Sequence, residues 1–160
     1  MAEAFYDFAR QFKHGQRGEE VLDAFFGARY NILPATAADE RRGIDRYFTD
    51  VTGRQLTVQY KTDTTAATTG NVFVEVVSVD THGKPGWVFS CRADWLVYYV
   101  PGWRTAFAVI PDNLRAALPK WYETCTLRPV RNKSYHTIGL LVPRLVFGAA
   151  CQQVIDLDGE

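Results

Sequence analysis

Asp45, Gln59 and Lys61 are the residues whose types and spacing best suit chemistry on a phosphodiester. Hydrolysis of that ester needs a divalent cation on the phosphate, an activated water and positive charge near the transition state. Mg²⁺ prefers oxygen ligands. Asp45 offers a carboxylate, Gln59 an amide oxygen and Tyr60 a backbone carbonyl. The Lys61 ammonium could orient the attacking water or stabilise the developing charge.

A β-hairpin is predicted to bring these residues together. Residues 44–51 and 55–62 are rich in β-branched and aromatic side chains, and a Thr-Gly pair between them marks a turn. Alternation along the second strand puts Gln59 and Lys61 on the same face. With the turn centred near that Thr-Gly pair, Asp45 is expected to pair near Gln59.

A further acid is predicted on a helix that precedes the hairpin. Aromatic residues at helical spacing predict a helix over residues 3–13, which Gly15 and Gly18 interrupt. A second helix follows and ends at the next glycine. Glu19 and Glu20 lie in its first turn, where the helix dipole favours acids. Either acid could serve only that dipole, or reach the hairpin if the helix packs over its end.

The remaining segments predict more sheet and one further helix within a single domain of residues 1–160, because no linker interrupts the chain. The predicted elements are a strand or extended lead-in over 29–34, a loop over 36–42, a mobile loop over 63–71, a strand over 71–79, apolar runs over 87–89, 95–100 and 105–110, a helix over 111–122, a basic loop over 127–134, and strands over 138–142 and 153–157.

Charge and cysteine content limit the class of protein. Lysine plus arginine and aspartate plus glutamate each number 18, so a nucleic-acid partner would need a local basic patch. The 3 cysteines are widely spaced without a Cys-x-x-Cys pair, which predicts reduced thiols in a cytoplasmic protein. No apolar run has transmembrane length, and the first residues lack a signal-peptide pattern, so no membrane partner is expected.

Taken in order, these motifs resemble the PD-(D/E)XK nuclease superfamily, and the archaeal Holliday-junction resolvases and small phage nucleases in particular. The resemblance extends over residues 1–110. The segments that carry it are Gly15-x-x-x-Glu19, Gly43-Ile44-Asp45, Val58-Gln59-Tyr60-Lys61, Thr69-Gly70-Asn71-Val72-Phe73-Val74-Glu75 and Ala93-Asp94-Trp95-Leu96-Val97-Tyr98-Tyr99-Val100.

The resemblance implies an α/β, restriction-endonuclease-like fold with a mixed central sheet flanked by helices. It implies a DNA endonuclease, selective for junctions or other branched DNA, that uses Mg²⁺, with Mn²⁺ as a substitute. The helix acid of the family maps onto Glu19, in preference to Glu20, and the strand acid onto Asp45. The Glu-x-Lys pair maps onto Gln59 and Lys61. A homodimer is implied as well, because two symmetric cuts need two sites.

Gln59 departs from the commoner glutamate of the motif and removes one negative charge from the site. This leaves open a catalytically inert module that binds nucleic acid or protein, and a small-molecule-binding α/β domain. Asp45 could make only turn hydrogen bonds, and Gln59 and Lys61 could lie on a solvated face. Glu75 could be another site acid, a partner for Lys61, or an exposed strand residue.

Two groups of basic residues are candidates for phosphate contacts, since arginine suits bidentate phosphate binding. Basic loops are also commonly solvated without any partner. The first group flanks Asp45 and the second lies in the predicted basic loop. The six candidates are Arg41, Arg42, Arg46, Arg128, Arg131 and Lys133.

Overall fold

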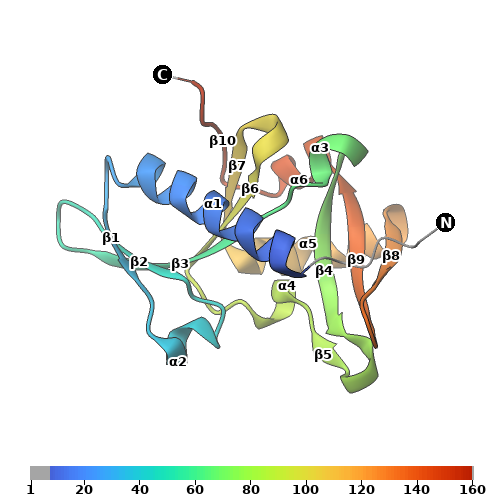
Figure 1. Cartoon of the computed structure of the whole chain (residues 1–160). Helices are drawn as coiled ribbons and strands as arrows, with labels where there is room; N and C mark the ends of the chain where they lie inside the picture. The colour runs from blue at the N-terminus through green and yellow to red at the C-terminus, as the bar shows by residue number, and fades with distance from the viewer. Residues whose placement is uncertain (1–7, 160) are drawn as a thin grey trace.

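A mixed six-stranded sheet forms the centre of the computed structural model, which describes residues 8–159 (Figure 1). The strand order is β1-β2-β3-β6-β7-β10, and every neighbouring pair is antiparallel except β3 and β6. The mixed central sheet that the resemblance implies is therefore confirmed. The strands are β1 (Asn31–Pro34), β2 (Arg46–Thr49), β3 (Gln55–Thr62), β6 (Trp95–Val100), β7 (Thr105–Val109) and β10 (Gln153–Asp156).

A second, antiparallel sheet of four strands was not predicted (Figure 1). Its order is β5 (Lys84–Pro85), β4 (Asn71–Val79), β9 (His136–Pro143) and β8 (Thr126–Arg131). The loop predicted over residues 127–134 is wrong over most of its length, because it contains β8. This strand lies at the sheet edge and is mostly exposed, so it lacks the apolar alternation that would predict a strand.

Helices flank the central sheet within one domain. α1 (Phe8–Phe26) lies across one face, while α5 (Pro111–Thr124) packs with the second sheet on the other. The helix predicted over 111–122 is thus confirmed. The shorter elements are α2 (Ala37–Glu40), α3 (Ala66–Thr69), α4 (Trp87–Ser90), α6 (Arg144–Ala149) and the 3₁₀ turns η1 (Asp80–His82) and η2 (Pro101–Trp103).

α1 is continuous where two helices were predicted. The helix runs through Gly15 and Gly18, so Glu19 and Glu20 lie inside it and not in a first turn. Gly18 is needed for packing, because a Cβ there would lie 2.0 Å from Oγ1 of Thr62 on β3. The helix predicted over 3–13 begins outside the described residues.

Two predicted loops contain helical turns. In the first, α2 begins after Thr36, whose hydroxyl accepts a hydrogen bond from the Asp39 N–H at 3.2 Å. In the second, Asp63 accepts hydrogen bonds from the N–H groups of Thr65 and Ala66, each at 2.9 Å, and α3 follows. Asp and Thr side chains that bond nearby backbone N–H groups stabilise such turns. The second segment, predicted as a mobile loop, therefore contains a helical turn, while its mobility stays a prediction.

The central sheet separates two hydrophobic clusters. On the α1 face, Leu22 packs with Val58 and Tyr60 of β3 and with strand residues beside them. On the other face, Leu96 and Tyr98 of β6 pack against the second sheet, α5 and α6. Within residues 8–159, no helix is both long and apolar enough to cross a membrane.

Candidate active site

The β2–β3 hairpin places Asp45 beside Gln59 and Tyr60, as predicted. Arg46 pairs with Val58 in the ladder, and the N–H of Asp45 donates to the Val58 carbonyl at 2.8 Å. Oδ2 of Asp45 in turn accepts a hydrogen bond from the Tyr60 N–H at 2.8 Å. One carboxylate oxygen is thus fixed on the strand that carries Gln59 and Lys61, and no hydrogen bond of the described residues engages Oδ1.

Gln59 is a buried polar residue with only 7 % of its surface exposed. Its Oε1 atom is fully enclosed and has no hydrogen-bond partner among the described residues. The loop before Asp45 encloses this amide. Gly43 has a φ of +74°, and a Cβ there would lie 3.2 Å from Nε2 of Gln59 and 3.1 Å from Cα of Cys91. Unpaired buried oxygens are rare in folded proteins, so a water or a cation is the expected partner of this one.

Lys61 shares a face of the central sheet with Gln59. The parallel register sets Gln59 beside Leu96 and Lys61 beside Tyr98, and both β6 residues belong to the cluster that faces the second sheet. The Lys61 side chain is half-buried. Its charge acts on the carboxyls of both Asp45 and Glu75, so it lies within electrostatic range of an acid from each sheet.

Glu19 lies on the α1 side of the central sheet and is held by Arg46. Nη2 of Arg46 is 3.2 Å from Glu19 and 3.1 Å from Asp23, and its guanidinium lies over the Tyr60 ring. The Tyr60 hydroxyl donates to Asp23 at 3.0 Å. Glu19 is half-buried while Glu20 is exposed, so Glu19 is the acid directed towards the hairpin.

Burial sets the electrostatics of the acids. It raises the pKa of the Asp45 carboxyl, while the Tyr60 N–H and then the Lys61 charge act in the opposite direction. Burial also raises the pKa of Glu19, an effect that the Arg46 charge opposes and the Asp45 charge reinforces. Asp45 and Glu19 therefore interact electrostatically although they approach from different elements.

The side-chain oxygens of Asp45 and Gln59 are the type of donor atom that a hard cation such as Mg²⁺ prefers. Within residues 8–159, no group of three or more His, Cys, Asp or Glu side chains is placed to hold a metal. Glutamine at position 59 and the pairing of Glu19 with Arg46 leave Asp45 as the central acid. Oδ1 of Asp45 and Oε1 of Gln59, neither of which is hydrogen-bonded to another described residue, are nevertheless oxygen donors of the type that Mg²⁺ binds. The Tyr60 carbonyl stays a predicted ligand.

The six basic candidates do not form two clusters. Arg41 and Arg42 are exposed near Asp45, with Arg42 paired to Asp39, whereas Arg46 is only 15 % exposed and pairs inward. Alternation along β8 places Arg128 and Arg131 on opposite faces of that strand.

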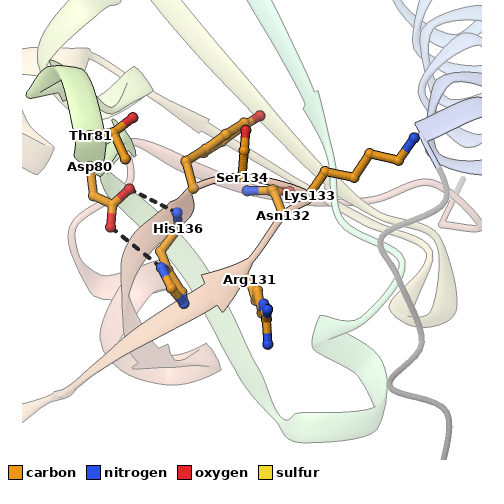
Figure 2. Close-up of a pocket in the computed structure, with 8 residues that line it drawn as sticks. Asp80, Thr81, Arg131, Asn132, Lys133, Ser134 and His136 are labelled. Carbon is orange, nitrogen blue, oxygen red and sulfur yellow. Dashed lines mark hydrogen bonds and ion pairs between the residues drawn. The ribbon is translucent and has the colours of Figure 1, made fainter.

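Arg131 and Lys133 line a hollow of about 410 Å³ at the β8–β9 turn (Figure 2). Asp80 and His136 form an ion pair there, 3.4 Å apart, and Lys133 extends away from that pair. The α2–β2 region around Asp45 lies on the other side of the molecule (Figure 1). The hollow is therefore separate from the candidate site around Asp45, Gln59 and Lys61.

The internal ion pair between Asp23 and Arg46 was not predicted from the sequence. The signal was present, since Glu19 and Asp23 lie four residues apart and share one face of a helix. Also not predicted was the place of Cys91, whose backbone contacts Gly43 and whose thiol lies 3.7 Å from the Gly43 carbonyl. No pattern in the sequence connects residues so distant along the chain.

No protein-family model, no curated protein and no solved structure matches this chain. Its function must therefore be argued from the geometry and chemistry of the site.

Proposed function

We propose that this protein is a Mg²⁺-dependent endonuclease that hydrolyses DNA phosphodiester bonds. The observation that carries the proposal is the buried Oε1 of Gln59, which is unpaired within residues 8–159 and lies next in the hairpin to the Asp45 carboxylate and two residues from Lys61. An enclosed amide oxygen without a partner costs stability, and ligation of a cation would offset that cost. The mixed sheet flanked by helices agrees with the restriction-endonuclease-like fold that the motifs imply.

Asp45 and Gln59 would hold the metal, together with the Tyr60 carbonyl. A bound Mg²⁺ supplies Lewis-acid chemistry at the phosphate and favours deprotonation of water. Lys61 contributes a fixed positive charge that orients the attacking water or stabilises charge on the phosphate oxygens. Glu19 pairs with Arg46 in the described geometry, so we assign it to holding Arg46 beside Asp45.

Cleavage assays test the proposal directly. A panel of labelled duplex, single-stranded, flap and four-way-junction DNAs is incubated with the protein in Mg²⁺ or Mn²⁺. We expect wild type to cut at least one substrate, and Lys61→Ala to cut it about 100-fold more slowly or not at all. Lys120→Ala, at an exposed position on α5, is the matched control. Equal cleavage by wild type and Lys61→Ala would remove Lys61 from the mechanism.

Metal binding is measured separately by calorimetry. Asp45→Asn retains an oxygen for the Tyr60 N–H but loses the charge, so it should bind Mg²⁺ and Mn²⁺ more weakly. Gln59→Glu restores a carboxylate and should bind them more tightly, while Gln55→Glu, exposed on the same face of β3, should not. Unchanged metal affinity in Asp45→Asn would place the metal elsewhere.

A catalytically inert module that binds nucleic acid or protein is the second candidate. The observation that favours it is the glutamine at position 59, which leaves fewer than three acids together among the described residues. Its signature is the absence of a calorimetric response to Mg²⁺ or Mn²⁺, combined with DNA binding if the module's partner is nucleic acid. DNA binding by either candidate should weaken with salt. Arg41→Ala and Arg42→Ala should each remove one phosphate interaction and make the log–log slope shallower by about 0.9.

A further inference from the structure

The enclosure around the Gln59 amide is built by two segments that are distant in the sequence. Gly43 belongs to the segment between α2 and β2, and Cys91 to the segment between α4 and β6. A Cβ at Gly43 would lie 3.1 Å from Cα of Cys91 and 3.2 Å from Nε2 of Gln59. The two segments therefore meet against the side chain whose Oε1 has no partner among the described residues.

An arginine adjoins each of these two contact residues. Arg42 comes immediately before Gly43, and Arg92 immediately after Cys91. The N–H of Arg92 donates to the carbonyl of Arg42 at 3.0 Å, so the two backbones are joined at this point. Both side chains are exposed. The two segments thus place a pair of arginines at the rim of the enclosure, on the side of the hairpin where α2 and α4 lie in Figure 1.

Each arginine has hydrogen-bond donors that the described residues do not engage. Arg92 donates from Nη1 to the Phe89 carbonyl at 2.8 Å. Arg42 donates from Nη1 to Asp39 at 3.3 Å. A guanidinium has five N–H donors in a planar fork that matches the oxygens of a phosphate. The pair between Arg42 and Asp39 is exposed, so it contributes little stability and a phosphate can replace it.

We propose that Arg92 joins Arg42 in binding the phosphate backbone of a DNA strand at the rim of the enclosed amide. The proposal rests on the proposed nuclease function, since it names the groups that would hold the strand at that site. Asp39 and Glu40 of α2 balance the charges of the two arginines that follow them. Arg92 therefore supplies the net positive charge that attracts a phosphate to this rim.

A simpler role for Arg92 is to bond the last carbonyls of α4. Arg115 already binds there, because its Nη1 donates to the carbonyls of Val88 at 2.9 Å and Cys91 at 3.3 Å. If Arg92 served only the helix end, loss of its bond to Phe89 would lower the stability of the protein and leave DNA binding unchanged. DNA affinity and its salt dependence therefore separate the two roles.

Fluorescence anisotropy with a short fluorescein-labelled DNA duplex in EDTA tests the proposal without metal or cleavage. We expect Arg92→Ala to bind about tenfold more weakly at low salt and to make the log–log salt slope shallower by about 0.9, because one phosphate contact is lost. Arg92→Lys retains the charge, so its slope should equal that of wild type. Arg54→Ala, exposed in the β2–β3 turn at the far end of the hairpin from Asp45, is the matched control and should change neither quantity.

Protection from phenylglyoxal, read by mass spectrometry, needs no variant. The same duplex should slow the modification of Arg42 and Arg92 about threefold relative to Arg54 in the wild-type protein, because bound phosphate covers their donors. Thermal unfolding checks that Arg92→Ala is folded, and the protection assay decides if it is not. Equal protection of the three arginines would overturn the proposal, as would an unchanged slope in folded Arg92→Ala.

The nuclease proposal and this one fail in different ways. If wild type cuts DNA but Arg92→Ala binds it with the wild-type affinity and slope, the nuclease stands and Arg92 is removed from the DNA contact. A wild-type protein that binds no DNA at low salt would contradict both proposals. Weaker binding by Arg92→Ala without any cleavage by wild type would support the phosphate contact and favour the inert nucleic-acid-binding module.

Discussion

Gln59 is a polar residue in a buried position that is unfavourable for the stability of the fold. Its side chain is enclosed between the Gly43 loop and the central sheet, yet its Oε1 atom has no partner among the described residues. A buried amide oxygen of this kind forgoes the hydrogen bonds that it makes with water in the unfolded chain. In folded proteins the large majority of buried polar side-chain atoms have a hydrogen-bond partner in the protein or an ordered water.

Replacement of Gln59 by methionine should therefore stabilise the protein. Methionine has a similar length and shape and carries no amide to desolvate, so we expect Gln59→Met to raise the free energy of unfolding by about 1 kcal/mol. Urea denaturation without added metal measures this change. Gln55→Met, exposed on the same strand, is the control and should change little. A loss of stability in Gln59→Met would mean that the amide is paired.

At the scale of elements, the contact between α1 and β3 fixes how the helix acids meet the hairpin. Gly18 allows the helix to touch Thr62, and Glu19 and Asp23 then reach Arg46. In the part of the chain that the structure describes, Gly15 has no neighbour within 4 Å of the position its Cβ would take, so it makes no such contact there. Two glycines of one helix thus serve different purposes.

Alanine substitutions at these glycines should have opposite effects. Gly15→Ala should stabilise the protein by about 0.5–1 kcal/mol, because alanine favours the helix over the unfolded chain. Gly18→Ala should destabilise it by about 1–3 kcal/mol through overpacking against Thr62. Thermal unfolding measures both, and the added Thr62→Ala change should recover part of the Gly18→Ala loss. Equal effects at the two positions would contradict the close helix–strand contact.

At the scale of the whole molecule, three acids are desolvated by the packing of helix and sheets. Burial raises the pKa values of Glu19, Asp45 and Glu75 above the ordinary 4.5 for glutamate and 3.8 for aspartate. Each of these carboxyls therefore takes up a proton at higher pH in the folded state than in the unfolded state. Proton uptake then favours folding over the interval between the ordinary and the raised pKa.

The free energy of unfolding in metal-free buffer should accordingly rise as the pH falls through the raised pKa values towards the ordinary 4.5 and 3.8. Asp45→Asn and Glu75→Gln should each flatten this dependence, because the substituted amides do not titrate. Urea denaturation across the pH range measures the slope. The lowered pKa values of Asp50 and Asp80 act in the opposite direction, mainly around and below 3.8. Stability that increased as the pH rose above 4.5 through this interval would contradict the desolvation of the three acids.

The hairpin that carries Asp45, Gln59 and Lys61 could be predicted from the sequence, because it depends on local alternation and a turn. The same holds for α5, which begins at a proline and follows helical periodicity. The preference for Glu19 over Glu20 agrees with their exposure. Such elements can be predicted because the periodicity of a strand or a helix relates residues that are only a few positions apart in the sequence.

Tertiary structure decided what depends on distant segments. The second sheet contains an edge strand whose residues resemble a basic loop, and only its pairing with β9 defines it. Gly18 on its own predicts an interruption of the helix, yet α1 continues through it. Its close approach to Thr62 of β3 is a tertiary contact that the local sequence does not indicate. Arg46 turns inward because two acids of α1 meet it there. Contacts between segments far apart in the chain leave no periodic trace in the sequence, so packing alone determines them.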